Sequence, residues 1–167
     1  MVQSFFIQNL IDEIESGSAY CKVVSQEELK EYLINTGECD NFPMISYEYT
    51  EDSNIDVGID ESKFLNDKEY TKGVWIQIFN ENTGENSAIL HLVENNHIRD
   101  IKISVMEVST QERRNGLGSK IIDAIIDSAT GRFETISCSP FDTNAMNFWS
   151  SMDFMVTDNY NYIYKLD

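Results

Sequence analysis

The sequence contains few of the residues that build unusual chain architectures. Its 167 residues include 2 prolines, 8 glycines and 3 cysteines, which excludes collagen-like and low-complexity chains. The cysteines Cys21, Cys39 and Cys138 stand far apart, with no C-x-x-C or Cys/His spacing. That pattern argues against a disulfide framework and against a zinc site. We therefore expect reduced thiols and no bound metal.

Long apolar runs are also missing. No stretch of about 18 apolar residues occurs, and the N-terminus lacks the basic start of a secretory signal. We expect a cytoplasmic protein that does not enter a membrane. With 41% hydrophobic and 25% charged residues, the chain resembles an ordinary globular protein, and we assign residues 1–167 to a single domain.

Basic residues are scarce. Lysine and arginine number 12 against 29 acidic residues, so the net charge is −17, which repels a phosphate backbone and makes nucleic acid an unsuitable ligand. Residues 1–100 hold 20 acidic and 6 basic residues, a net charge of −14, whereas the rest of the chain carries −3. The acidic part is either a solvated surface or a surface that attracts a cationic substrate.

Hydrophobic periodicity predicts an α/β domain built on a mixed sheet. Seven runs are typical of strands: 20–24, 74–79, 88–93, 98–108, 133–137, 154–157 and 160–166. Helices are predicted over about 3–15, 25–37, 116–130 and 143–152. The segment 40–72 is less distinct; we expect an extended run from Met44 to Tyr49 and a short helix from Glu61 to Tyr70.

One segment combines features that suit a pyrophosphate. After the strand that ends near Val108, a short loop carries Arg113, Arg114, Gly116 and Gly118, and a long helix follows. Such a strand–loop–helix unit directs unpaired N–H groups and the positive end of a helix at one point. The spacing fits neither a P-loop nor the G-x-G-x-x-G dinucleotide motif.

The hexamer Arg113-Arg-Asn-Gly-Leu-Gly118 resembles the R/Q-x-x-G-x-G/A signature of the GNAT acetyltransferase superfamily. That family has a valine five residues earlier, where this chain has Val108. A second family signature, N-x-x-A-x-x-x-Y-x-x-x-G-F, is approximated by residues 142–154, which depart from it at Asp142, Trp149 and Asp153. The resemblance implies a GNAT-like α/β (α+β) fold: a mixed, mostly antiparallel sheet of about seven strands with helices on both faces.

The same resemblance implies acetyl-CoA as the bound coenzyme. In the family, the fourth and fifth strands diverge and the pantetheine lies between them, with the pyrophosphate at the loop. Transferred to matching positions, the implied coenzyme-binding residues are Met106, Val108, Arg113, Arg114, Asn115, Gly116, Leu117, Gly118, Ser119, Asn144 and Trp149.

The implied reaction is N-acetyl transfer to a cationic primary amine, by direct attack within a ternary complex. The acceptor is a small-molecule amine or a protein lysine or N-terminus. We take Glu107 and Tyr160 as catalytic candidates, and Tyr162 and His91 as alternatives. Trp149 replaces the usual phenol, and an indole cannot supply a proton near neutral pH.

Strand alternation further predicts which side chains share a face. It places Asp100, Lys102, Ser104 and Met106 on the face of Val108, and Glu107 on the opposite face.

Two other functions remain open at this stage. A non-catalytic acyl-CoA-binding relative would explain Trp149 and the lack of an obvious base. An acidic interaction protein that masks a basic partner surface would explain the charge. The oligomeric state is also open, with a homodimer as one alternative.

Overall fold

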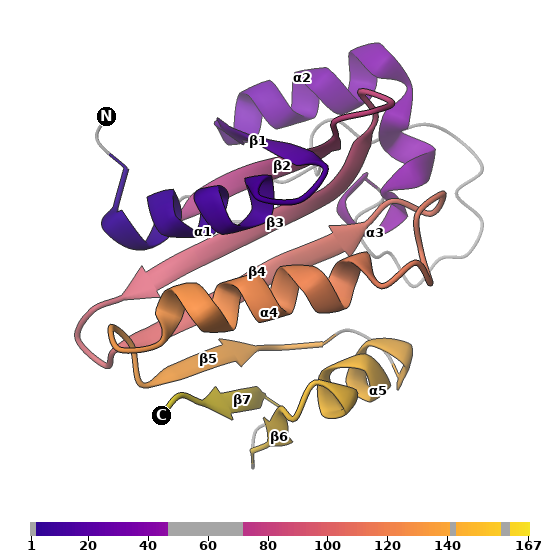
Figure 1. Cartoon of the computed structure of the whole chain (residues 1–167). Helices are drawn as coiled ribbons and strands as arrows, with labels where there is room; N and C mark the ends of the chain where they lie inside the picture. Colours follow the sequence, from indigo (N-terminus) through magenta and orange to yellow (C-terminus); the bar gives the residue numbers. More distant parts are fainter. Residues whose placement is uncertain (1–2, 47–71, 141–142, 158–160) are drawn as a thin grey trace.

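The computed structural model describes residues 3–46, 72–140, 143–157 and 161–167 (Figure 1). A seven-stranded sheet runs in the order β1-β2-β3-β4-β5-β7-β6. All neighbouring strands are antiparallel except β4 and β5, which are parallel. The strands are β1 (Ala19–Val24), β2 (Val74–Asn80), β3 (Asn86–Asn95), β4 (Asp100–Val108), β5 (Thr135–Cys138), β6 (Met155–Val156) and β7 (Tyr162–Lys165). The predicted mixed, mostly antiparallel sheet is confirmed.

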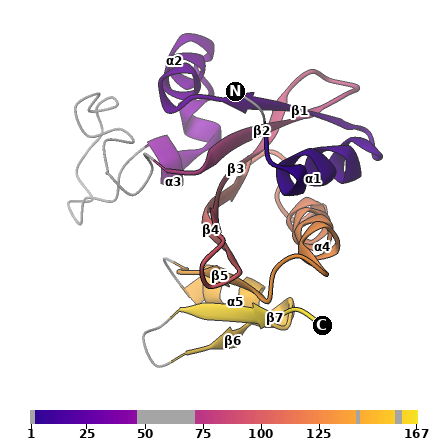
Figure 2. The ribbon, with the colours of Figure 1, turned by 90° about the vertical axis from the view of Figure 1, so that its left-hand side faces the viewer.

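Helices cover both faces of the sheet (Figure 2). Helices α1 (Phe5–Glu15) and α4 (Leu117–Ala129) lie side by side on one face. The other face carries α2 (Gln26–Thr36), the 3-10 helix η1 (Glu38–Asn41) and α3 (Pro43–Ser46), while α5 (Thr143–Ser151) follows β5. Ser25 and Glu28 form a capping box at the start of α2, and Gly37 ends that helix in the left-handed conformation.

Two hydrophobic cores lie on the two sides of the sheet. Side chains such as Leu10 of α1 and Ile125 of α4 form the larger core with the strands. Leu33 of α2, Phe42 and Trp75 belong to the smaller core on the other side. Within the part of the chain that the structure describes, no helix is long and apolar enough to cross a bilayer.

A β-bulge changes the phase of β4. Val105 pairs with His91, but Ile103 pairs with the next residue of β3, so Ser104 is an extra residue in β4. One extra residue shifts the alternation of side chains by one position. Ile103 and Met106 therefore pack on the same core, with α1 and α4, whereas Val105 packs in the smaller core.

The bulge makes part of the alternation prediction wrong. Asp100 and Lys102 lie on the face opposite Val108, because Ser104, which forms the bulge, separates the two halves of the strand. The predicted opposition of Glu107 and Val108 is confirmed, since both lie beyond the bulge. Strict alternation holds only within an unbulged run.

The extended conformation predicted from Met44 is wrong for the residues described. Pro43 to Ser46 form α3, and the N–H groups of Met44 and Ile45 bond a carboxylate on β4. Proline suits the first helical position, because it lacks an N–H that would have no partner there. The helix predicted from Glu61 to Tyr70 lies outside the described residues.

Candidate active site

A cleft opens where β4 and β5 separate. Their pairing ends at Ile103 and Cys138, although β4 continues to Val108. The resulting cavity has a volume of about 560 Å³. Its lining includes Met106 from one face of the sheet and Met44 from the other. The cavity therefore passes between the two strands and is accessible to groups from both faces.

Main-chain groups at the end of β4 point into this cleft. The Ser109 N–H donates to the Ser87 carbonyl, 2.8 Å away, and so points toward β3. Consecutive N–H groups of a strand point in opposite directions, so those of Val108 and Met106 point away from β3. On that side the pairing with β5 has already ended. These two residues thus offer main-chain N–H donors to a ligand, whereas the Val108 carbonyl already accepts from Arg113.

The loop after β4 is held by contacts at both ends. The Thr110 N–H donates to the carbonyl of Asn41 at 3.0 Å, which links the loop to η1. Arg113 folds back along the loop, and its Nε donates to the Val108 carbonyl at 3.1 Å. The loop is therefore shaped before any ligand arrives.

The first turn of α4 lines the cleft and has no side-chain cap. Its N-cap is Gly116, with φ +80°, so no side chain caps the first turn. Arg114 also has a positive φ, +69°, which turns the chain sharply before the helix. A Cβ built on Gly118 would lie 3.4 Å from the ring of Phe148. Gly118 and Phe148 both line the cleft, and the Phe148 ring leaves little room between the two helices. A long side chain at position 118 would therefore extend into the cleft.

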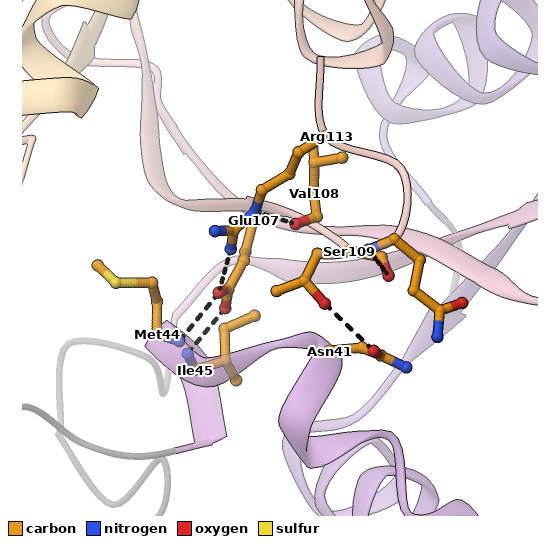
Figure 3. Close-up of polar contacts among 9 residues, drawn as sticks. Asn41, Met44, Ile45, Glu107, Val108, Ser109 and Arg113 are labelled. Carbon is orange, nitrogen blue, oxygen red and sulfur yellow. Dashed lines mark hydrogen bonds and ion pairs between the residues drawn. The ribbon is translucent and has the colours of Figure 1, made fainter. Parts of the chain in front are cut away.

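Glu107 holds α3 and the loop together (Figure 3). Its Oε2 accepts from the Met44 N–H and its Oε1 from the Ile45 N–H, both at 2.9 Å. The Arg113 guanidinium lies 3.3 Å from Oε2. The side chain of Glu107 is 4% exposed. Burial raises the pKa of Glu107 to about 7, although the two N–H bonds and the charge of Arg113 act in the opposite direction.

Helix α5 forms the opposite wall. Trp149 is buried and lines the cleft, with its ring centroid 4.9 Å from that of Phe154. Asn144 lines the same wall and is exposed. Cys138 also lines the cleft, and burial raises the pKa of its thiol to about 12. That thiol is protonated near neutral pH and is a poor nucleophile.

Most of the implied coenzyme-binding residues line this one cleft. Those present in its lining are Met106, Val108, Arg113, Arg114, Gly116, Leu117, Gly118, Ser119, Asn144 and Trp149. Asn115 is exposed on the loop and does not line the cleft. Lys120 lines a second cavity of about 460 Å³ between α1 and α4.

The acid and base candidates are placed differently. Tyr160 lies outside the described residues, and Tyr162 is buried in the larger core. His91 is also buried, its ring centroid 4.6 Å from that of Trp75, and it does not line the cleft. Glu107 does line it.

In the described residues, no group of three His, Cys, Asp or Glu side chains could hold a metal ion.

Sequence reasoning missed Met44 and Phe148 as lining residues. Met44 lies 63 residues before its partner Glu107, in a segment without clear periodicity. Phe148 precedes the Trp149 position of the second signature and could have been found from helical spacing next to Asn144.

The fold resembles those of solved acetyltransferases, although no protein-family model and no curated protein matches the sequence. A GNAT-family acetyltransferase from Staphylococcus aureus Mu50 is 17% identical, with a TM-score of 0.60 over 89% of this chain and 99% of that one. A variant of spermidine N-acetyltransferase from Vibrio cholerae is 11% identical, with a TM-score of 0.52 over 84% and 81%.

A third structure is an acetyltransferase from Bacillus subtilis in complex with CoA. It is 14% identical, with a TM-score of 0.50 over 65% of this chain and 86% of that one. Together these likenesses show that the chain shares the fold of a GNAT-family acetyltransferase and of two other acetyltransferases. The activity of this chain is argued below from its own cleft.

Proposed function

We propose that this protein is an acyl-CoA-dependent N-acetyltransferase. It transfers an acetyl group from acetyl-CoA to a cationic primary amine, by direct attack in a ternary complex. The observation that carries this proposal is the cleft between β4 and β5, because the Arg113–Ser119 segment and the unpaired end of β4 line the same cavity. A likeness to a CoA complex supports the choice of coenzyme.

The lining suits the parts of an acyl-CoA molecule. The main-chain N–H groups of Met106 and Val108, which point away from β3 beyond the end of the β5 pairing, suit the amide oxygens of a pantetheine arm. The uncapped start of α4 and the guanidinium of Arg114 suit a pyrophosphate. Gly118 lets the coenzyme approach the helix closely, because a side chain there would enter the cleft.

The bound thioester supplies an activated acyl group, and the chain stabilises the charge that develops as the amine attacks. A main-chain donor at the Val108 N–H, preset and facing the cleft, would stabilise the oxyanion by about 3 kcal/mol. The protonated thiol of Cys138 favours direct transfer over an acyl-enzyme on that residue. Glu107 also lines the cleft, but both of its carboxylate oxygens accept N–H groups of α3, so its role is argued separately below.

The acceptor is proposed to reach the cleft from the side of α2 and α3. Met44 lines the cleft on that face, opposite the face of α4. Residues 19–46, which supply this side, hold five acidic residues against two lysines. Such a surface concentrates a cation and repels an anion. The likeness to a spermidine N-acetyltransferase supports an amine acceptor.

A non-catalytic acyl-CoA-binding protein is the second candidate, and Trp149 favours it. The indole lines the cleft at the position of the family's phenol, and it cannot protonate a departing thiolate. Binding of acetyl-CoA without turnover of any amine would support this second candidate function.

The deciding experiment measures release of free thiol from acetyl-CoA with a panel of polyamines, aminoglycosides and basic peptides. We expect thiol release together with a product heavier by one acetyl group. Gly118→Glu should abolish both, and Gly118→Ala is the matched control, since its Cβ makes an ordinary contact with Phe148. Binding of acetyl-CoA without product from any amine would contradict the catalytic proposal.

A further inference from the structure

Glu107 joins two parts of the chain that both line the cleft and that lie far apart in the sequence. On one side its carboxylate accepts the first free N–H groups of α3, from Met44 and Ile45. On the other side it pairs with Arg113 of the coenzyme loop. Thr110 of the loop also contacts Asn41 of η1, directly before α3. The Thr110 N–H donates to the Asn41 carbonyl at 3.0 Å, and the Thr110 hydroxyl donates to Asn41 Oδ1 at 3.2 Å, the contact drawn beside Glu107 in Figure 3. The loop is thus connected to α3 through Glu107, and to η1 directly before α3 through Thr110.

The position of α3 matters because Met44 lines the cleft. A shift of this short helix would move the wall on the side proposed for the acceptor. Four residues form too short a helix to be stable by itself, so its position depends on contacts from the sheet. In the described residues, the carboxylate of Glu107 provides a link from α3 to β4 with two bonds of 2.9 Å.

We infer that Glu107 is a positioning residue that couples the coenzyme loop to the acceptor wall at α3. This inference rests on the proposed function. Arg113 transmits the coupling: its contacts with Val108 and Glu107 use two of its five N–H donors, so others remain for a phosphate. A phosphate at the loop would immobilise the guanidinium, which in turn would hold the carboxylate and α3 in place.

Hydrogen exchange of the Met44 and Ile45 amides, measured at pH 8, tests the link. Without coenzyme, Glu107→Gln should exchange about tenfold faster at these amides, since an amide side chain accepts with one oxygen and loses a bond to a charged group. Saturating CoA should slow exchange at both amides in the parent chain. Arg113→Gln should lose that slowing, although it keeps the bonds between Glu107 and α3.

Arg99→Gln is the matched control. It breaks an ion pair with Glu134 that is also 3.3 Å long, at the other end of β4. This variant should show the parent response to CoA. Unchanged or faster exchange in the parent chain upon CoA saturation would overturn the coupling. An undiminished response in Arg113→Gln would overturn the role of that side chain.

Steady-state kinetics separates positioning from catalysis. If Glu107 positions the wall, Glu107→Gln should raise the KM for the amine severalfold and leave kcat nearly unchanged. A fall in kcat with an unchanged KM would make Glu107 the general base and overturn the inference. Calorimetric titration with CoA tests the proposed function independently of the coupling. If CoA does not bind the parent chain, the proposed function is wrong. If CoA binds but does not slow exchange at Met44 and Ile45, only the coupling is wrong.

Discussion

The guanidinium of Arg113 lies 3.3 Å from Oε2 of Glu107, but the two side chains differ greatly in exposure. Arg113 is 47% exposed, whereas Glu107 is 4% exposed. The cation therefore faces the cleft, and its carboxylate partner lies beneath it against α3. This arrangement places positive charge at the cleft of a chain whose net charge is −17.

Acetyl-CoA should stabilise the folded chain, because a ligand that binds only the folded state shifts the unfolding equilibrium. At 100 times its dissociation constant it should add about 2.7 kcal/mol to the free energy of unfolding. The midpoint of thermal unfolding, measured with and without acetyl-CoA, checks this. An unchanged midpoint at millimolar acetyl-CoA would remove the coenzyme from the proposal.

Two substitutions at position 118 should separate an effect on coenzyme binding from an effect on folding. A Cβ there lies 3.4 Å and 3.5 Å from atoms of the Phe148 ring, so Gly118→Ala should fold and still bind coenzyme. Gly118→Glu extends a negative charge into the cleft and should abolish detectable binding. Circular dichroism verifies folding, and calorimetry measures affinity. Equal affinity of both variants and the parent chain would place the coenzyme elsewhere.

Protonation of Glu107 should appear in the pH dependence of stability. Burial raises its pKa to about 7 in the folded chain from 4.5, so the folded state binds the proton more tightly than the unfolded state. Its stabilising contribution is therefore complete below pH 4.5 and is lost as the pH rises toward 7. Glutamine resembles the protonated form and does not titrate.

The measurement is urea unfolding of the parent chain and Glu107→Gln at pH 5.5 and pH 8. The stability of the variant relative to the parent should rise by about 2 kcal/mol between these pH values. Glu134→Gln, which removes an exposed carboxylate, is the control for net charge. A difference that stays constant with pH would show that Glu107 does not titrate in this range.

Salt should reduce the efficiency of transfer to a cationic acceptor. Attraction between exposed charges is screened over about 8–10 Å at physiological ionic strength. The specificity constant for a polyamine should therefore fall as salt rises from about 50 to about 500 mM, whereas that for a neutral amine should change little. If the specificity constant for the polyamine does not change with salt, the acidic residues do not attract the acceptor and serve solubility alone.

The sequence by itself determined the seven strands, the four longer helices and their order. The periodicity that predicted helices over about 3–15, 25–37, 116–130 and 143–152 is a local signal, and the structure confirms these helices. The loop motif from Arg113 to Gly118 was also readable, because its residues are contiguous and their spacing carries the geometry.

The tertiary structure decided what depends on distant residues. Neither the bulge at Ser104 nor the end of pairing at Ile103 has a local signature, since each depends on how β4 meets its two neighbours. The role of Glu107 was equally hidden, because its partners Met44 and Ile45 lie 63 and 62 residues away. The sequence does not show whether a carboxylate on a strand faces water or the buried start of a helix. Only the packing of the folded chain distinguishes these two environments.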